Sequence, residues 1–331
     1  MAHQRDKHGP AGGDGGALAL FHPAVRDWFK ASFSEPTRAQ TLGWPAIASG
    51  QSTLILAPTG SGKTLTAFLW SINRLMFSPL PPRQQRCRVL YISPLKALAV
   101  DVERNLRAPL AGVSNLASSR GESFVAPAIA VRTGDTPPGD RRRFLREPAD
   151  ILITTPESVY LLLTSNAREL LRSVETVIVD EIHALVPNKR GVHLAISLER
   201  LNRICAAPPQ RIGLSATQRP LDEVAHFLGG FDPEPIRSAR RASTKTSSRA
   251  PAPSPEVQLH EEFASQEARS RFRPVTIVDT AEKKQLSLRV EVPVEEMAKL
   301  GDAVDIQSGP AVQGPGRASI WPAIHPRLLE L

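Results

Sequence analysis

The sequence of 331 residues predicts an α/β fold in which a parallel sheet is flanked by helices. Short apolar runs rich in β-branched residues alternate with stretches whose apolar residues recur at helical spacing, which is typical of parallel sheets. A Gly-rich loop also stands between one such run and a helix, as a phosphate-binding loop requires. The expected strands are Thr53–Ala57, Val89–Ser93, Ile129–Arg132, Ile151–Thr154, Val177–Asp180 and Ile212–Ser215, and the clearest helices are Leu65–Phe77, Leu95–Leu106 and His193–Ile204.

Composition divides the chain into four segments. Residues 1–20 begin Gly-rich and polar and are expected to form a disordered tail, and residues 21–230 carry the alternating pattern. Residues 231–270 are rich in Ser, Arg, Ala and Pro and are expected to be a flexible linker or insert. Residues 271–331 contain one alternating strand pattern and the start of a helix, too little for an independent core. We therefore expect the beginning of a second domain there, without the rest of it.

The net charge of +8 favours an anionic partner, with nucleic acid as the first candidate and ordinary solvated surface charge as the alternative. The two cysteines, Cys87 and Cys205, have no metal-ligand spacing and form no disulfide framework, so both are expected to be reduced. No apolar run is long enough to cross a bilayer, and the N-terminus has no signal-peptide pattern. These observations predict a cytoplasmic protein.

The loop Ala-Pro-Thr-Gly-Ser-Gly-Lys-Thr at residues 57–64 predicts a nucleotide site. Gly60 and Gly62 lack a β-carbon, so the backbone can adopt positive φ and approach a triphosphate closely, with N–H groups of the following helix pointing at the phosphates. Lys63 would bring positive charge to the β- and γ-phosphates, and the Thr64 hydroxyl would ligate Mg²⁺. The general pattern begins with Gly where this chain has Ala, and a Gly-containing turn before an ordinary helix is the alternative.

Two adjacent carboxylates, Asp180 and Glu181, follow the apolar run at residues 177–179. Because charge burial is costly unless it is compensated, a bound Mg²⁺ is expected beside them. Asp180 would hold the ion directly or through water, and Glu181 would polarise the water that attacks the γ-phosphate. A strand running into an acidic loop is the alternative, but the two motifs together supply complementary halves of one site.

Six segments, in this order, resemble superfamily-two helicases of the DEAD/DEAH type, and two more resemble the Lhr (large helicase-related) group. The resemblance covers residues 20–228 well and residues 270–331 more loosely. It implies a RecA-like domain followed by an incomplete start of a second one, and it accounts for the alanine at position 57. The six segments are FSEPTRAQ at 33–40, APTGSGKT at 57–64, SPLKAL at 93–98, TPES at 155–158, DEIH at 180–183 and SAT at 215–217; the narrower pair is VRTGDT at 131–136 and NKRGVHLAISLERL at 188–201.

The resemblance implies roles for further residues. Gln40 would recognise adenine, although alone it suggests only a polar residue on a helix. The residues that would bind the nucleotide are Gln40, Thr59, Gly60, Ser61, Gly62, Lys63 and Thr64, and the catalytic ones are Glu181, Lys63 and Asp180. Those that would couple the nucleotide site to a second domain and to strand binding are His183, Ser215 and Thr217. Four residues would face a nucleic-acid backbone: Lys96, Arg132, Thr155 and Ser158. Basic and hydroxyl groups are suited to contacts with phosphates.

The resemblance also implies a function, an ATP-dependent helicase that couples Mg-ATP hydrolysis to binding of single-stranded nucleic acid. DNA and a role in DNA repair are favoured, with RNA or a hybrid as the alternative substrate. Such helicases close two RecA-like domains around ATP, and the second domain supplies arginines that stabilise the transferring phosphoryl group. No segment of this sequence resembles those arginine motifs. The alternative is therefore an ATP- and nucleic-acid-binding module without strand-separating activity, and a kinase using the same loop explains fewer of the segments.

Overall fold

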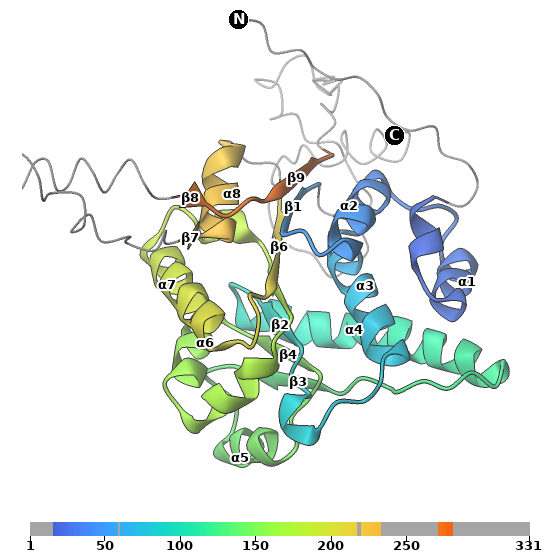
Figure 1. Ribbon diagram of the computed structural model, residues 1–331, viewed down its shortest axis with the longest axis horizontal. Helices are drawn as coiled ribbons and strands as arrows, with labels where there is room; N and C mark the ends of the chain where they lie inside the picture. The colour runs from blue at the N-terminus through green and yellow to red at the C-terminus, as the bar shows by residue number, and fades with distance from the viewer. Residues whose placement is uncertain (1–15, 59, 217–219, 233–270, 281–331) are drawn as a thin grey trace, which may run out of the picture. The chain divides into compact units, whose positions relative to one another are not determined.

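A computed structural model describes residues 16–58, 60–216, 220–232 and 271–280 (Figure 1). The chain divides into two compact units, Met1–Ala281 and Glu282–Leu331, and every described residue belongs to the first. The second unit, which contains most of the expected second domain, lies outside the described residues, as do the expected tail through residue 15 and residues 233–270 of the expected linker.

Seven parallel strands form the central sheet in the order β3-β4-β2-β5-β6-β1-β9. The predicted parallel sheet and its six predicted strands are confirmed, and β9 is a seventh strand that the sequence did not predict. A separate antiparallel pair joins β7 to β8. The strands are β1 Thr53–Leu56, β2 Val89–Ile92, β3 Ile129–Arg132, β4 Ile151–Thr154, β5 Thr176–Val179, β6 Gln210–Ser215, β7 Phe231–Asp232, β8 Arg271–Phe272 and β9 Thr276–Asp279.

Local sequence signals set several helix starts. Thr37 and Gln40 form a capping box at the start of α2, the Asn188 side chain accepts the Gly191 N–H at the start of α7, and Pro156 occupies the first turn of α6. The α-helices are α1 Pro23–Ser32, α2 Arg38–Ala48, α3 Lys63–Phe77, α4 Lys96–Ser119, α5 Pro138–Arg146, α6 Pro156–Leu163, α7 Lys189–Ile204 and α8 Leu221–Gly229; the 3-10 turns are η1 Ala17–Leu20, η2 Arg83–Gln85, η3 Asn166–Ser173 and η4 Ile182–Ala184.

Side chains of each strand alternate between two hydrophobic cores, one on each face of the sheet. Ile55 of β1 joins the core formed with α1, α2, α3 and α4, whereas its neighbours Leu54 and Leu56 join the core formed with α6, α7 and α8. Figure 1 shows these two groups of helices on opposite sides of the strands. Burying each such aliphatic side chain contributes roughly 1.5–3 kcal/mol, so both faces hold the strands in register and fix where their ends lie.

Strand β9 corrects the expected boundary of the second domain. It pairs with β1 from Thr276 opposite Thr53 to Asp279 opposite Leu56, and both the N–H and the hydroxyl of Thr280 donate to the Leu56 carbonyl, at 2.9 and 2.8 Å. Residues 271–280 therefore belong to the first compact unit. The expectation that residue 271 begins another domain is wrong for this segment, because a four-residue run after a long polar stretch does not indicate with which sheet it pairs.

The expected disordered tail is also too long at its C-terminal end. Residues 17–20 form η1 rather than a tail, and Ala17 and Leu18 pack against the core on the side of α2 and α3. Two apolar residues at the end of a Gly-rich stretch thus suffice to dock this turn.

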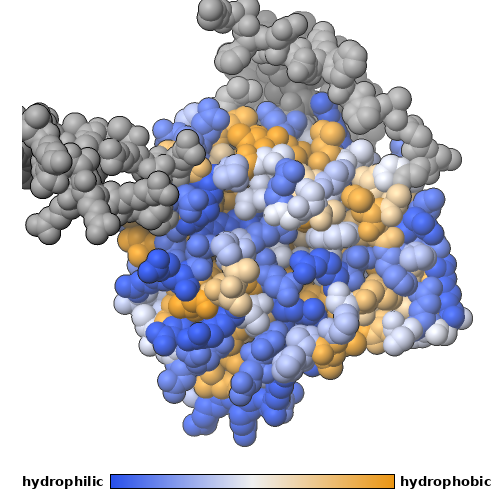
Figure 2. All heavy atoms as spheres, viewed as in Figure 1, coloured by the Kyte–Doolittle hydropathy of each residue, from blue (hydrophilic) through white to orange (hydrophobic). Residues whose placement is uncertain are grey.

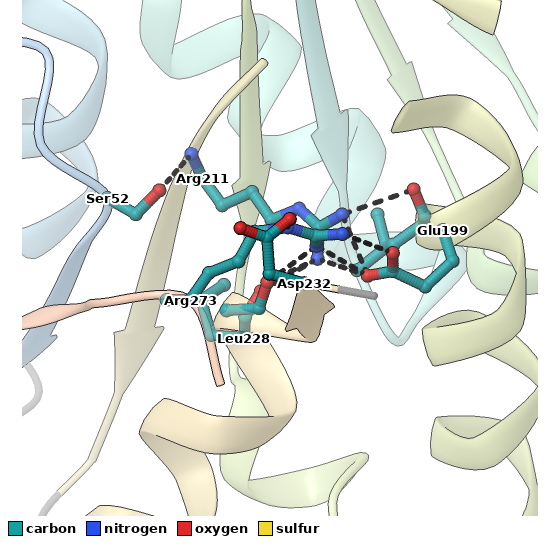
Figure 3. A network of polar contacts seen from close by, with 8 residues as sticks. Ser52, Glu199, Arg211, Leu228, Asp232 and Arg273 are labelled. Carbon is teal, nitrogen blue, oxygen red and sulfur yellow. Dashed lines mark hydrogen bonds and ion pairs between the residues drawn. The ribbon is translucent and has the colours of Figure 1, made fainter. Parts of the chain in front are cut away.

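A buried arginine network attaches the segment before β9 to the domain (Figure 3). The Arg211 guanidinium donates to Glu199 Oε1 at 3.1 Å and to the carbonyls of Leu228 and Gly229, at 3.0 and 3.1 Å. Arg273 donates to Glu199 Oε2 at 2.7 Å and to the same Gly229 carbonyl at 2.9 Å. The two guanidinium groups therefore satisfy the C-terminal carbonyls of α8 while they share one carboxylate, a favourable place for positive charge.

No helix within the described ranges combines the length and apolar character needed to cross a bilayer. In the view of Figure 2, hydrophilic residues cover much of the described surface and apolar residues form separate patches between them.

Candidate functional site

The carboxyl ends of three neighbouring strands, β5, β6 and β1, carry the predicted nucleotide-site residues. In parallel α/β sheets, this carboxyl edge is where ligands bind. The loop beginning at Ala57 follows β1, Asp180 follows β5, and Ser215 is the last residue of β6. The Ala57 N–H donates to the Ser215 carbonyl at 3.2 Å. Motifs that lie far apart in the sequence thus meet at one edge of the sheet.

The phosphate loop has the backbone conformation that the sequence predicts. Gly60 has a φ of 80° and Gly62 a φ of 78°, both in the left-handed region that favours glycine. The Ser61 hydroxyl donates to the Pro58 carbonyl at 2.7 Å and closes the turn. A β-carbon at Gly62 would lie 2.9 Å from Gln40 Nε2, so a side chain there would also have to displace the end of Gln40.

Lys63 folds back beneath its own loop. Its ammonium group donates to the Ala57 carbonyl at 2.6 Å and to the Pro58 carbonyl at 3.1 Å, and the residue is only 8% exposed. Thr64 is half-buried in the first turn of α3. The structure therefore brings a positive charge, a hydroxyl and the N-terminus of a helix to one loop, the groups from which a phosphate site is built.

Gln40 has a structural role as well as its predicted one. It is buried, its Oε1 accepts the Thr37 N–H at 2.8 Å, and its own N–H donates to the Thr37 hydroxyl at 3.4 Å. Its amide nitrogen meanwhile faces Gly62 of the phosphate loop. The residue is more than a surface polar group on a helix, because it connects the start of α2 to the loop.

Asp180 is 7% exposed, and two donors hold its carboxylate. Oδ1 accepts the Glu181 N–H at 2.9 Å, and Oδ2 accepts the Tyr91 hydroxyl. Burial raises the pKa of Asp180, opposed by the Tyr91 hydrogen bond and by the nearby charge of Lys63. Sequence reasoning missed Tyr91, because a tyrosine within the apolar run of β2 gives no sign that its hydroxyl reaches the next strand.

Glu181 occupies a strained position. Among the described residues it is the only non-glycine with positive φ, at 44°. Such a conformation costs about 1–3 kcal/mol and is concentrated at functional sites. Glu181 Oε2 lies 3.3 Å from His183 Nε2. The strained backbone therefore directs the carboxylate away from the strand and toward the histidine.

His183 links the ends of β5 and β6. Its Nδ1 accepts the Ala216 N–H at 3.3 Å and lies 3.4 Å from the Ser215 hydroxyl. Because Nδ1 is an acceptor, the ring proton of neutral His183 belongs on Nε2, facing Glu181. Two further predicted residues, Thr59 and Thr217, lie outside the described residues.

The four residues expected to face nucleic acid occupy different environments. Lys96 is exposed, and its ammonium lies 2.7 Å from both Asp135 oxygens, a pair that solvent competes for and that contributes about 0–1 kcal/mol. Arg132 is half-buried, and burial lowers its pKa. Thr155 and Ser158 are each 3% exposed, and the Thr155 hydroxyl donates to Ser158 at 3.1 Å. The structure thus presents Lys96 to solvent and encloses both hydroxyls.

Arg190 is a second residue that sequence reasoning missed. Its guanidinium donates to Glu157 at 2.6 Å and to the Pro94 carbonyl at 2.8 Å. It therefore joins the start of α7 to the start of α6 and to the loop after β2. Its place within the Lhr-like segment was the available signal, but no partner could be assigned from spacing.

The donor set at the carboxyl edge suits magnesium. Within the described residues, no group of three or more His, Cys, Asp and Glu side chains is gathered to hold an ion. Magnesium typically takes one or two carboxylates and completes its shell with water and substrate phosphates. Asp180 and Thr64 fit that requirement.

Comparison with known proteins gives consistent matches. Residues 37–224 match the family described as DEAD/DEAH box helicase. The chain is 45% identical over 314 residues to the "Lhr helicase/ probable uracil glycosylase" of Mycolicibacterium smegmatis, covering 95% of this chain and 17% of that protein. It is 47% identical over 215 residues to the "ATP-dependent helicase Lhr-Core" of Methanothermobacter thermautotrophicus, covering 64% of this chain and 25% of that protein.

The chain is also similar to a solved structure of the Mycobacterium smegmatis helicase Lhr bound to ssDNA and AMP-PNP, with 44% sequence identity and a TM-score of 0.67. The match covers 95% of this chain and 33% of the chain in that structure. The chain therefore spans a sixth to a third of the length of these proteins. The match to this helicase confirms the predicted RecA-like fold of the described domain.

Proposed function

The chain belongs to the DEAD/DEAH box helicase family, and from this premise we propose that it is the ATP-binding motor domain of an Lhr-type helicase. The predicted resemblance to the Lhr group is confirmed by the identity along 95% of the chain. In the proposed function, the carboxyl edge of the sheet binds and hydrolyses Mg-ATP and couples this reaction to binding of a single nucleic-acid strand.

One observation carries the proposal: the contacts at the carboxyl edge form a connected series. Lys63 lies under the phosphate loop and acts electrostatically on Asp180. Asp180 accepts the N–H of Glu181, and Glu181 lies against His183. His183 in turn contacts the last residue of β6. A change at the phosphate loop thus has a physical route to the segment after β6.

Each residue has a role that follows from its place in this series. Lys63 would leave its loop carbonyls to bind the β- and γ-phosphates, with the amide groups of Gly60 and Gly62 around them. Gln40 would bind adenine beside the loop. Glu181 would accept a proton from the attacking water, and such general-base assistance contributes about 10²–10⁴-fold in rate. His183, which presents its Nε2 proton to Glu181, would hold that carboxylate in position.

Thr64 and Asp180 would hold Mg²⁺. When bound, the ion neutralises charge on the phosphates as the bond to the γ-phosphate breaks. The buried carboxylate of Asp180 supports this assignment, because its raised pKa reflects a negative charge that the protein alone stabilises poorly.

Single-stranded DNA is the proposed partner, with RNA or a hybrid as the alternative. The Mycobacterium smegmatis relative is described with ssDNA and AMP-PNP, and the chain carries a net charge of +8. Lys96 is exposed and pairs with exposed Asp135, and it can exchange that carboxylate for a phosphate. Thr155 and Ser158 would have to separate to reach a strand. A phosphate-based contact of this kind weakens steeply with salt. The proposed biological role is in DNA repair.

A second candidate function is an ATP- and nucleic-acid-binding module without strand-separating activity. It is supported by the described domain itself, which holds the phosphate loop and the exposed Lys96 that these two binding functions require. Both candidates use the same nucleotide site, and they differ in whether bound ATP turns over.

The test is ATP turnover by the full chain with and without single-stranded DNA, alongside a binding measurement for Mg-ATP. Turnover stimulated by the strand supports the motor, whereas binding without turnover supports the module. Absence of both binding and turnover contradicts the two candidates together. Lys63→Ala is the matched control, since it should weaken Mg-ATP binding by about tenfold or more and lower whichever signal the wild type gives.

A further inference from the structure

A cavity of about 1190 Å³ lies at the amino edge of the sheet, where the strands begin. Its lining includes Arg88, Glu175 and Pro208, which stand just before β2, β5 and β6. The nucleotide loop follows β1 at the other end of the strands. The cavity is therefore separate from the proposed ATP site, and the volume is ample for a small organic ligand.

Arg88 is a buried cation without a partner. The residue is 8% exposed, and its Nε is buried without a hydrogen-bond partner. Within the described part of the chain, its guanidinium makes no hydrogen bond or ion pair. Burial lowers the pKa of Arg88, against the opposing charges of Glu175 and Asp150. A buried charge without a partner is costly and is rarely kept for packing alone.

The backbone around Arg88 is fully engaged, so the residue cannot easily move away. Its N–H donates to the Asp150 carbonyl at 3.1 Å, and its carbonyl accepts the Glu175 N–H at 2.9 Å. These bonds join the starts of β4, β2 and β5. The backbone that carries the guanidinium is thereby held by the sheet itself, a rigid support for a binding group.

Nearby carboxylates already form ion pairs with other arginines. The ion pairs around the cavity are Arg86 with Asp150, Arg74 with Glu175 at 2.7 Å, and both Arg172 and Arg168 with Glu169, at 2.6 and 3.5 Å. Among these five arginines of the described domain, Arg88 alone has no acidic partner in contact. Its positive charge is therefore the one that a ligand can pair with.

We propose that this cavity binds a carboxylate-bearing organic anion, with Arg88 as the residue that recognises the carboxylate. A guanidinium presents two parallel N–H groups to a carboxylate, a geometry that ammonium groups lack. A carboxylate is planar like the guanidinium, so its two oxygens can accept both of these N–H groups.

The rest of the cavity fits the same class of ligand. Gln84 and Asn166 line it with exposed amide groups that can orient polar atoms, and Pro79 and Leu145 supply apolar wall. The mixture of one fixed cation, a few amides and apolar surface is typical of sites for small organic molecules.

The experiment is thermal unfolding of the full chain, without nucleotide, titrated with glutarate at constant ionic strength. A second titration uses a glutamate capped at both termini, and a third uses inorganic phosphate. We expect glutarate to raise the unfolding midpoint of the wild type by mass action. In Arg88→Met, we expect the apparent affinity to fall by about tenfold or more. Arg88→Lys should also weaken binding, because it keeps the charge and loses the fork.

The control variant is Arg104→Met, which removes an exposed arginine of α4 that does not line the cavity. Its response to glutarate should match the wild type. Without anion, Arg88→Met should be at least as stable as the wild type, since an unmatched charge has been removed. A marked loss of stability in Arg88→Met would show that the charge is already satisfied and would overturn the proposal.

The remaining outcomes are also decisive. A response to capped glutamate but not to glutarate would assign the carboxylate to a polypeptide side chain, and a response to both would include free acids. Equal responses of the wild type and Arg88→Met, or a response to phosphate alone, would overturn the proposal. So would the absence of any response to both carboxylates.

Discussion

At the carboxyl edge, Lys63 rests on two carbonyls of its own loop and Glu181 holds a strained backbone, whereas at the amino edge Arg211 is enclosed by a complete set of acceptors. Both edges bury charge within the same sheet. The difference lies in whether the protein supplies the partners. Where a carboxylate of the protein pairs with the cation, as Glu199 does with Arg211, the charge serves the fold. Where backbone carbonyls hold the cation, as they hold Lys63, the charge is available to a ligand.

The largest expected effect concerns catalysis at the carboxyl edge. Glu181→Gln removes the group that would accept the proton of the attacking water, so ATP turnover should fall by about 10²–10⁴-fold. Mg-ATP affinity should change little, since the phosphate loop is intact. Initial-rate measurements with saturating ATP check this, and a variant with wild-type turnover would exclude Glu181 as the base.

Next in size is a stability effect at the amino edge. Arg211→Met leaves Glu199 and the α8 carbonyls with fewer donors, and each buried carbonyl left without a donor costs about 1–3 kcal/mol. Mg-ATP binding to the folded fraction should be unchanged. Denaturant unfolding measures the loss, with Arg203→Met in the exposed last turn of α7 as the control. Equal stability of the two variants would show that the network does not support the fold.

A smaller effect concerns the hydrogen bond between the Tyr91 hydroxyl and Asp180. Tyr91→Phe keeps the ring in the core and removes the hydroxyl that donates to Asp180. Leaving a buried acceptor without its donor should lower the free energy of unfolding by about 1–3 kcal/mol. Denaturant unfolding again provides the value. A neutral result would mean that Asp180 finds another donor.

The smallest effect is a pH dependence at the amino edge. Burial alone would raise the pKa of Glu199, but the hydrogen bonds and charges of Arg273 and Arg211 outweigh it and hold the pKa below its ordinary value of 4.5. The folded state therefore favours the carboxylate, and this contribution is present above pH 4.5 and is lost as the pH falls further. Relative to Glu199→Gln, the wild type should lose about 1 kcal/mol on acidification, since the group is partly exposed. Parallel acid unfolding profiles of both proteins would contradict this.

Sequence reasoning was most successful where function constrains short motifs. The glycines of the phosphate loop and the order of strands and helices follow from local chemistry, because positive φ and alternating apolar runs leave direct signatures. Tyr91, Arg88 and Arg211 could not be found in this way. Their surroundings are built by residues of other strands and helices, so only the folded arrangement reveals them. Strand β9 was missed for the same reason.

The measurement that tests the central claim most directly is Mg-ATP binding by the full chain and by Lys63→Ala, measured by titration calorimetry. The account predicts binding by the wild type and a loss of about tenfold or more in the variant, the size of one lost charge-assisted hydrogen bond. Lys30→Ala, on the exposed end of α1, should retain wild-type affinity. Unchanged affinity in Lys63→Ala would contradict the assignment of the carboxyl edge as the ATP site.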